Sequence, residues 1–151
     1  MKNLIIAFLV IGGFLSCKSQ EDPTTFSEEF LIQIANDPLF IAYQETVHTD
    51  AENIVLENYD MEGIGKIFDA LPFGTNICLS EEAKEKFSHL KGGELYLENE
   101  CKRQELVQKL DQKFNYSSFP QDVAFKIVRI YRELNYIQLE ERATDLYYRK
   151  N

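Results

Sequence analysis

Residues 37–58, DPLFIAYQETVHTDAENIVLEN, carry the strongest helical signal in this 151-residue chain. Apolar side chains recur every three or four residues, a spacing that gathers them on one face of an α-helix. Asp37 is a good capping residue, and proline suits the first helical position that Pro38 takes. We therefore predict a long amphipathic helix with one face toward the core and an acidic face toward solvent. The core face comprises Phe40, Tyr43, Val47, Ala51, Ile54 and Asn58; the outer face carries Gln44, Glu45, Glu52 and Glu57.

The remainder of the chain repeats this helical spacing. Shorter helices are predicted over residues 26–35, 61–71 and 80–90, and Gly92-Gly93 interrupts the pattern before a helix that ends near residue 115. A last helix begins at Pro120, runs through Ile137 and can continue on the same face to Tyr147. Because no run of strand length alternates with period two, no strand is predicted. The sequence predicts one all-α domain over residues 26–151, an irregular bundle of five to six helices.

The beginning of the chain, MKNLIIAFLVIGGFLSCKSQ, has a different character. Lys2 precedes a run of twelve residues, Leu4 to Leu15, that is apolar except for two glycines and too short to span a bilayer. Together with Ser16-Cys17 this resembles the signal peptide and lipobox of a bacterial lipoprotein, although Phe14 stands where the pattern prefers a branched aliphatic residue. The polar run after the cysteine, with Glu21-Asp22, resembles the surface-export signal of Bacteroidota lipoproteins.

The resemblance implies that residues 1–16 are removed, that Cys17 is lipidated and that residues 17–25 form a short tether. The domain would then be held in the cell envelope, at the outer membrane, on its periplasmic or its outer face. Its lipid would make the membrane its first partner, since acyl chains bury in the bilayer. The alternatives are an ordinary secretory signal and an uncleaved anchor.

Charge is distributed unevenly along the chain. Without residues 1–16, which contain Lys2, 15 Lys and Arg remain against 25 Asp and Glu, so the net charge is 15 − 25 = −10. Residues 19–65 hold eleven acids and neither Lys nor Arg, whereas residues 101–151 hold ten bases and seven acids. Acidic helices can lie beside basic ones within the domain, or an acidic face can attract a cationic partner. Nucleic acid is disfavoured because phosphate binding requires clustered positive charge.

Cys78 and Cys101 are the other two cysteines, and an exported chain meets an oxidising compartment. They are therefore predicted to form a disulfide, which would stabilise the fold by about 3.5 kcal/mol in the chain-entropy model. Two buried free thiols are the alternative. Their spacing lacks the pattern typical of zinc ligands.

Two clusters of ionisable residues invite a chemical interpretation. Asn58, Asp60, Glu62 and Asp69, with Gly63, resemble a calcium-binding EF-hand loop, but they equally suit a turn between helices capped by Asp60. His48 lies between Glu45 and Glu52 on one predicted helix face, where the three could bind zinc or exchange protons. An exposed histidine on a solvated helix is the ordinary alternative.

No nucleophile elbow and no nucleotide-binding glycine motif occurs in the sequence, so neither an enzyme activity nor a cofactor is predicted. Tyr147, Tyr148 and Arg149 belong to the residue types that dominate protein interfaces. We therefore expect a lipid-anchored envelope protein that binds another protein, as an assembly accessory, an inhibitor or an immunity-type protein. The alternative is a module that binds a small ligand or a cation at the acidic turn around Asp60.

Overall fold

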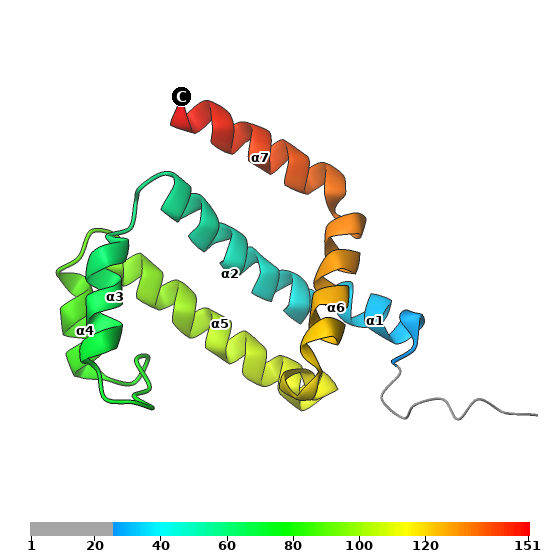
Figure 1. The fold of residues 1–151 in the computed structure, drawn as a ribbon, viewed down its shortest axis with the longest axis horizontal. Helices are drawn as coiled ribbons and strands as arrows, with labels where there is room; N and C mark the ends of the chain where they lie inside the picture. Colours follow the sequence, from blue (N-terminus) through cyan, green and yellow to red (C-terminus); the bar gives the residue numbers. More distant parts are fainter. Residues whose placement is uncertain (1–25) are drawn as a thin grey trace, which may run out of the picture.

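The computed structural model describes residues 26–151 and folds them into seven α-helices and a 3₁₀ turn, with no strand (Figure 1). The prediction of a single all-α domain is confirmed, with one helix more than the upper expected number. The elements are α1 (Glu28–Ala35), α2 (Pro38–Val55), α3 (Met61–Ala70), α4 (Glu81–Ser88), α5 (Gly93–Phe114), η1 (Tyr116–Ser118), α6 (Gln121–Leu134) and α7 (Tyr136–Lys150).

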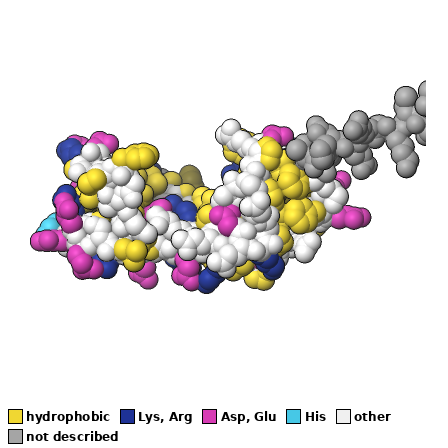
Figure 2. All heavy atoms as spheres, turned by 90° about the horizontal axis from the view of Figure 1, so that it is seen from below, with side chains coloured by type: hydrophobic (Ala, Val, Ile, Leu, Met, Phe, Trp, Pro, Cys, Tyr) yellow, Lys and Arg dark blue, Asp and Glu magenta, His cyan; other side chains and the backbone are white. Residues whose placement is uncertain are grey.

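The long helices α2 and α5 pack against each other through the middle of the molecule and run in opposite directions. Helices α3 and α4 lie at one end of this pair, and α1 and α6 lie at the other (Figure 1). The last helix, α7, returns from α6 along the side of α2 that faces away from α5. In a view at right angles, the molecule narrows between its two ends (Figure 2).

Polar side chains begin four of the helices as their residue types predict. Asp37 accepts a hydrogen bond from the amide of Leu39 at 2.9 Å, and Asp60 accepts one from Gly63 at 2.9 Å. Ser27 and Ser80 cap α1 and α4 in the same way. These bonds satisfy amides that have no partner within the helix, so local sequence accounts for where α1 to α4 begin.

The buried apolar side chains form two separate clusters, one at each end of the α2–α5 pair. The end formed by α1 and α6 buries Leu31, Ile34, Ala35, Phe40, Leu110, Ile127, Ile130 and Tyr131. The end formed by α3 and α4 buries Tyr59, Ile64, Ile67, Ile77, Ala83, Phe87 and Leu97. Because α5 supplies Leu110 to one cluster and Leu97 to the other, it is the helix that joins the two ends.

The predicted orientation of α2 is wrong beyond its first turn. Phe40 is fully buried as expected, but Val47 and Ile54 from the predicted core face are 38% and 45% exposed. The other buried residues of α2 are instead polar, Gln44, Thr46 and Asp50, and the last two accept hydrogen bonds from α5. Of the predicted stripe, Ala51 lines the space between α2 and α7, whereas Tyr43 lies on the side of α5.

The final predicted helix is two helices, separated at Asn135. Its side-chain Nδ2 donates to the carbonyl of Tyr131 at 2.8 Å, and its backbone N–H donates to the same oxygen at 3.0 Å. A side-chain amide that competes for a helix carbonyl favours a break at that residue. Within residues 26–151, no helix is both long enough and apolar enough to cross a membrane.

Candidate functional site

The contact between α2 and α5 is polar at its centre. Asp50 accepts hydrogen bonds from the hydroxyl of Tyr59 at 3.0 Å and from Nδ2 of Asn99 at 2.6 Å, and it forms an ion pair with Arg103. Asn99 also donates to the carbonyl of Thr46 at 2.8 Å. Each buried polar group therefore has a partner, which is what makes a buried polar cluster tolerable.

Tyr59 serves this cluster as a donor. Burial raises the pKa of its phenol far above the ordinary value, and the hydrogen bond to Asp50 and the charge of Asp50 raise this pKa further. The hydroxyl consequently stays protonated at any physiological pH. We interpret this network as a structural link between the two clusters, because its acid and its base are already paired with each other.

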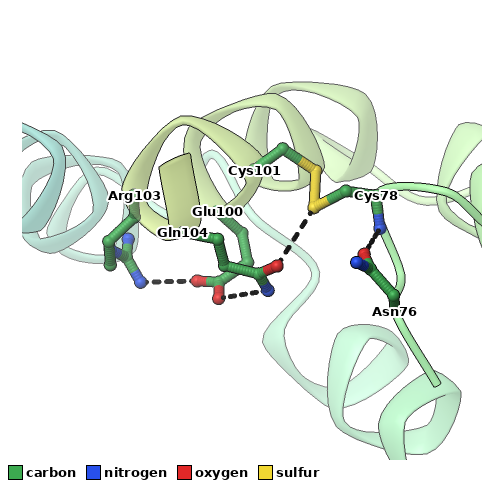
Figure 3. The surroundings of a disulfide bond; sticks show 6 residues. All are labelled: Asn76, Cys78, Glu100, Cys101, Arg103 and Gln104. Carbon is green, nitrogen blue, oxygen red and sulfur yellow. Dashed lines mark hydrogen bonds and ion pairs between the residues drawn. A yellow bond between two sulfur atoms is a disulfide. The ribbon is translucent and has the colours of Figure 1, made fainter. Parts of the chain in front are cut away.

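A shallow surface pocket of about 310 Å³ opens beside this network. Arg103 Nη1 donates to Glu100 Oε2 at 2.7 Å, and Gln104 Nε2 donates to Glu100 Oε1 at 3.2 Å (Figure 3). Tyr43, Val107 and Gln108 complete the lining. Since Arg103 and Glu100 pair with each other, the pocket offers mainly amides and one aromatic ring to a neighbouring molecule.

The predicted pairing of Cys78 with Cys101 is confirmed, because their sulfur atoms lie at disulfide distance and their Cα atoms are 5.5 Å apart. Figure 3 shows that the pair joins the segment before α4 to α5, next to Gln104. Asn76 Oδ1 accepts from the backbone amide of Cys78 at 3.1 Å and so orders this segment locally. The pair therefore attaches the α3–α4 end to the central helix.

The predicted cation site around Asp60 is not brought together. Asn58 donates to Asn53 at 2.9 Å, Asp60 caps α3, and Glu62 forms an ion pair with Lys66 at 2.5 Å. Asp69 lies near the other end of α3, about 13 Å farther along the helix axis at 1.5 Å per residue. No group of three acids, histidines or cysteines suited to a metal was found within residues 26–151. The geometry matches the alternative interpretation, a capped turn between helices.

Glu45, His48 and Glu52 do share a face of α2, but both acids form ion pairs with Arg142 of α7. Its Nη1 donates to Glu45 Oε2 at 2.8 Å, and its Nε donates to Glu52. The two acids are thereby engaged in holding α7 and do not form a pair with His48. Arg142 is 90 residues from Glu52 in sequence, and no sequence motif marks this contact.

His48 projects from α2 and packs against α6. Its ring stacks on Tyr131 with the centroids 6.2 Å apart, and its Nε2 atom is buried without a hydrogen-bond partner among the described residues. Desolvation lowers the pKa of the imidazole first, and the positive charge of Arg142 lowers it next. The imidazole is therefore neutral at pH 7.

The residues predicted for partner binding lie on the outer surface of α7. Tyr147 and Tyr148 are 64% and 74% exposed, with their ring centroids 5.6 Å apart, and Arg149 forms an ion pair with Asp145 one turn earlier. No side chain of α7 is buried. The two tyrosines are therefore accessible to a partner.

Cys17, the predicted lipidation site, lies outside the described residues. No protein-family model, curated protein or solved structure matches the chain.

Proposed function

We propose that this chain is a lipid-anchored protein of the cell envelope that acts by binding another protein through the outer face of α7. The anchor is proposed from the lipoprotein-like leader and Cys17. The observation that supports binding is the exposure of large side chains on α7, a helix with no buried residue and with only Leu139 packed against a buried cluster.

The exposed side chains lie on one side of the helix. Ile137 and Tyr148 are eleven residues apart, which is close to three full turns, so they lie on the same face about 16 Å apart. Tyr136 and Tyr147 have the same relation. All four are more than 60% exposed, and large exposed apolar groups of this kind mark interaction surfaces on soluble domains.

Acidic residues separate the two apolar ends of this face. Glu140 and Glu141 lie between them, and both are exposed. The whole chain carries a net charge of −9. We therefore propose a partner with a basic surface between two apolar pockets, because complementary charge accelerates encounter and fixes the register of docking.

The anchor is tested by metabolic labelling with an alkyne fatty acid. The full chain should acquire the label and sediment with envelope membranes, and Cys17→Ser should lose the label. Cys78→Ser is the matched control because it removes a cysteine that the proposal does not use. Equal labelling of the wild type and Cys17→Ser would refute lipidation at this residue.

The binding surface is tested by placing a photo-crosslinking amino acid at Tyr148 and, as a control, at Lys84 on α4. We expect one defined adduct from position 148 and none from position 84. With the partner identified by mass, Tyr148→Ala should weaken binding about tenfold or more, as loss of an interface tyrosine commonly does. Unchanged affinity after Tyr148→Ala and Ile137→Ala would refute this face as the interface.

A further inference from the structure

A cavity of about 270 Å³ lies between α2, α6 and α7. Its apolar walls come from α2 and α7. Ala51 and Val55 line it from α2, and Leu139, Ala143 and Leu146 line it from α7. Most ligand pockets in proteins are clefts of this kind, with apolar walls and a few polar groups that orient the ligand.

The polar groups of the cavity are two arginines, one acid and one histidine. Arg142 and Glu52 form an ion pair, so their charges offset each other. Arg132 differs, because no ion pair or hydrogen bond joins its guanidinium to another residue within 26–151. The neighbouring acid on α6, Glu133, lies 3.6 Å from Arg129 and not beside Arg132.

His48 also lines the cavity, with its ring stacked on Tyr131 of α6. Its Nε2 is the one buried side-chain nitrogen or oxygen without a hydrogen-bond partner within the described residues. A buried polar atom of this kind costs about 1–3 kcal/mol unless a partner satisfies it. Because this nitrogen has almost no accessible surface, it does not face the open space of the cavity. Arg132, which is exposed, is therefore the polar group of the cavity that can meet a ligand.

We infer that this cavity binds a small organic anion whose carboxylate lies against Arg132 and whose apolar body fills the space between α2 and α7. A guanidinium is suited to a carboxylate because its two N–H groups can donate to the two oxygens in parallel. One unpaired cation calls for one negative charge. The apolar wall selects an alkyl or aryl body over a free inorganic anion.

Helix α7 is built to allow entry. It buries no side chain, and Arg142 is its ion-pair connection to α2. One residue outside the helices, Asn135, separates α7 from α6. Elements with few buried contacts open at low free-energy cost, so α7 can move aside to admit the ligand and close on it.

The test uses octanoate as the probe and thermal unfolding of the full chain in detergent, followed by circular dichroism. Octanoate should raise the midpoint of unfolding in the wild type, and octan-1-ol should raise it less because it lacks the charge. Arg132→Gln should weaken the response to octanoate about tenfold on the concentration axis. Arg129→Gln, which removes a cation from the same helix outside the cavity, is the matched control and should respond like the wild type.

A second variant tests the cavity itself. Ala143→Leu adds three carbons to the wall on α7, outside both buried clusters, so it should leave the fold intact while abolishing the response to octanoate. The proposal fails if millimolar octanoate leaves the wild-type midpoint unchanged. It also fails if all variants respond alike, or if octan-1-ol acts as strongly as octanoate.

Discussion

Helices α5 and α7 both lie alongside α2, on opposite sides, yet they are attached to it in opposite ways. Helix α5 buries Leu97 and Leu110 in the two clusters, shares the polar network of Asp50 and is joined to the α3–α4 end through Cys101. Helix α7 buries nothing and meets α2 through Arg142 and across a cavity.

A helix can be amphipathic without contributing a buried residue to the core. Both helices have apolar residues at helical spacing, and α2 lines the cavity beside α7 with Ala51 and Val55 but buries Thr46 and Asp50 against α5. The polar contact between α2 and α5 is nevertheless stable, because its buried polar groups are hydrogen-bonded to one another. We conclude that α5 carries the stability of the domain and that α7 is available for binding.

The largest effect is expected from removing the covalent link of α5. Cys78→Ser combined with Cys101→Ser opens a loop of 23 residues and should lower the free energy of unfolding by about 3.5 kcal/mol. Urea denaturation measures the loss, and reduction of the wild type should reproduce it. If the double variant were as stable as the wild type, this link would have no part in the stability of α5.

A matched pair of leucines tests the comparison directly. Leu110→Ala on α5 removes a fully buried side chain and should cost about 3 kcal/mol through lost burial and the cavity left behind. Leu146→Ala on α7 removes a partly exposed one and should cost less than about 1 kcal/mol. Equal losses in urea denaturation would contradict the distinction between the two helices.

A smaller effect is expected from Arg142→Gln, which removes both ion pairs between α7 and α2. Partly exposed pairs contribute little, so the free energy of unfolding should fall by about 1 kcal/mol or less. Amide hydrogen exchange should nevertheless accelerate along α7 while α5 keeps its protection. Arg149→Gln is the control, because its ion pair with Asp145 lies within α7. If the amides of α7 exchange at the wild-type rate in Arg142→Gln, Arg142 is not what attaches α7 to α2.

The smallest effect concerns His48 beneath α7. Its folded-state pKa is lowered from 6.5 by desolvation, by Arg142 of α7 and by Arg132 of α6, against the opposing charges of Glu45 and Glu52 on α2. Below pH 6.5 the unfolded chain therefore binds more protons than the folded one, and stability is lost as pH falls from 6.5 toward the lower folded-state value. His48→Gln should therefore reduce this loss between pH 7.5 and 5.5. The same slope of stability against pH in His48→Gln and in the wild type would exclude His48 as its source.

Local sequence was sufficient for most of the secondary structure. The caps at Asp37, Asp60 and Ser80, together with residue spacing, predicted where α2, α3 and α4 begin, and the absence of alternating runs predicted an all-α domain. The pairing of Cys78 with Cys101 also followed from composition and an expected oxidising compartment. The separation of α6 from α7 was missed, because it depends on one bond from Asn135 to a helix carbonyl.

The candidate sites were harder to predict. The acids around Asp60 looked like a cation site in sequence, but α3 spans the predicted loop and separates Asp60 from Asp69. The exposure of Tyr147 and Tyr148 agrees with their predicted availability, although binding stays a proposal. The cavity beneath α7 had no sequence signal, because Arg132, Arg142 and His48 meet from three helices.

Spacing and capping are local properties, so the chain's linear order already established which residues form helices, which side chains share a face and which two cysteines could pair. What each face packs against is a long-range property. The polar residue Asp50 of α2 is buried because Asn99 and Arg103 of α5 supply its partners, whereas Val47 and Ile54 of the predicted apolar face are partly exposed. A buried polar group is stable only with its partner in place, and that partner is known only after the helices have packed.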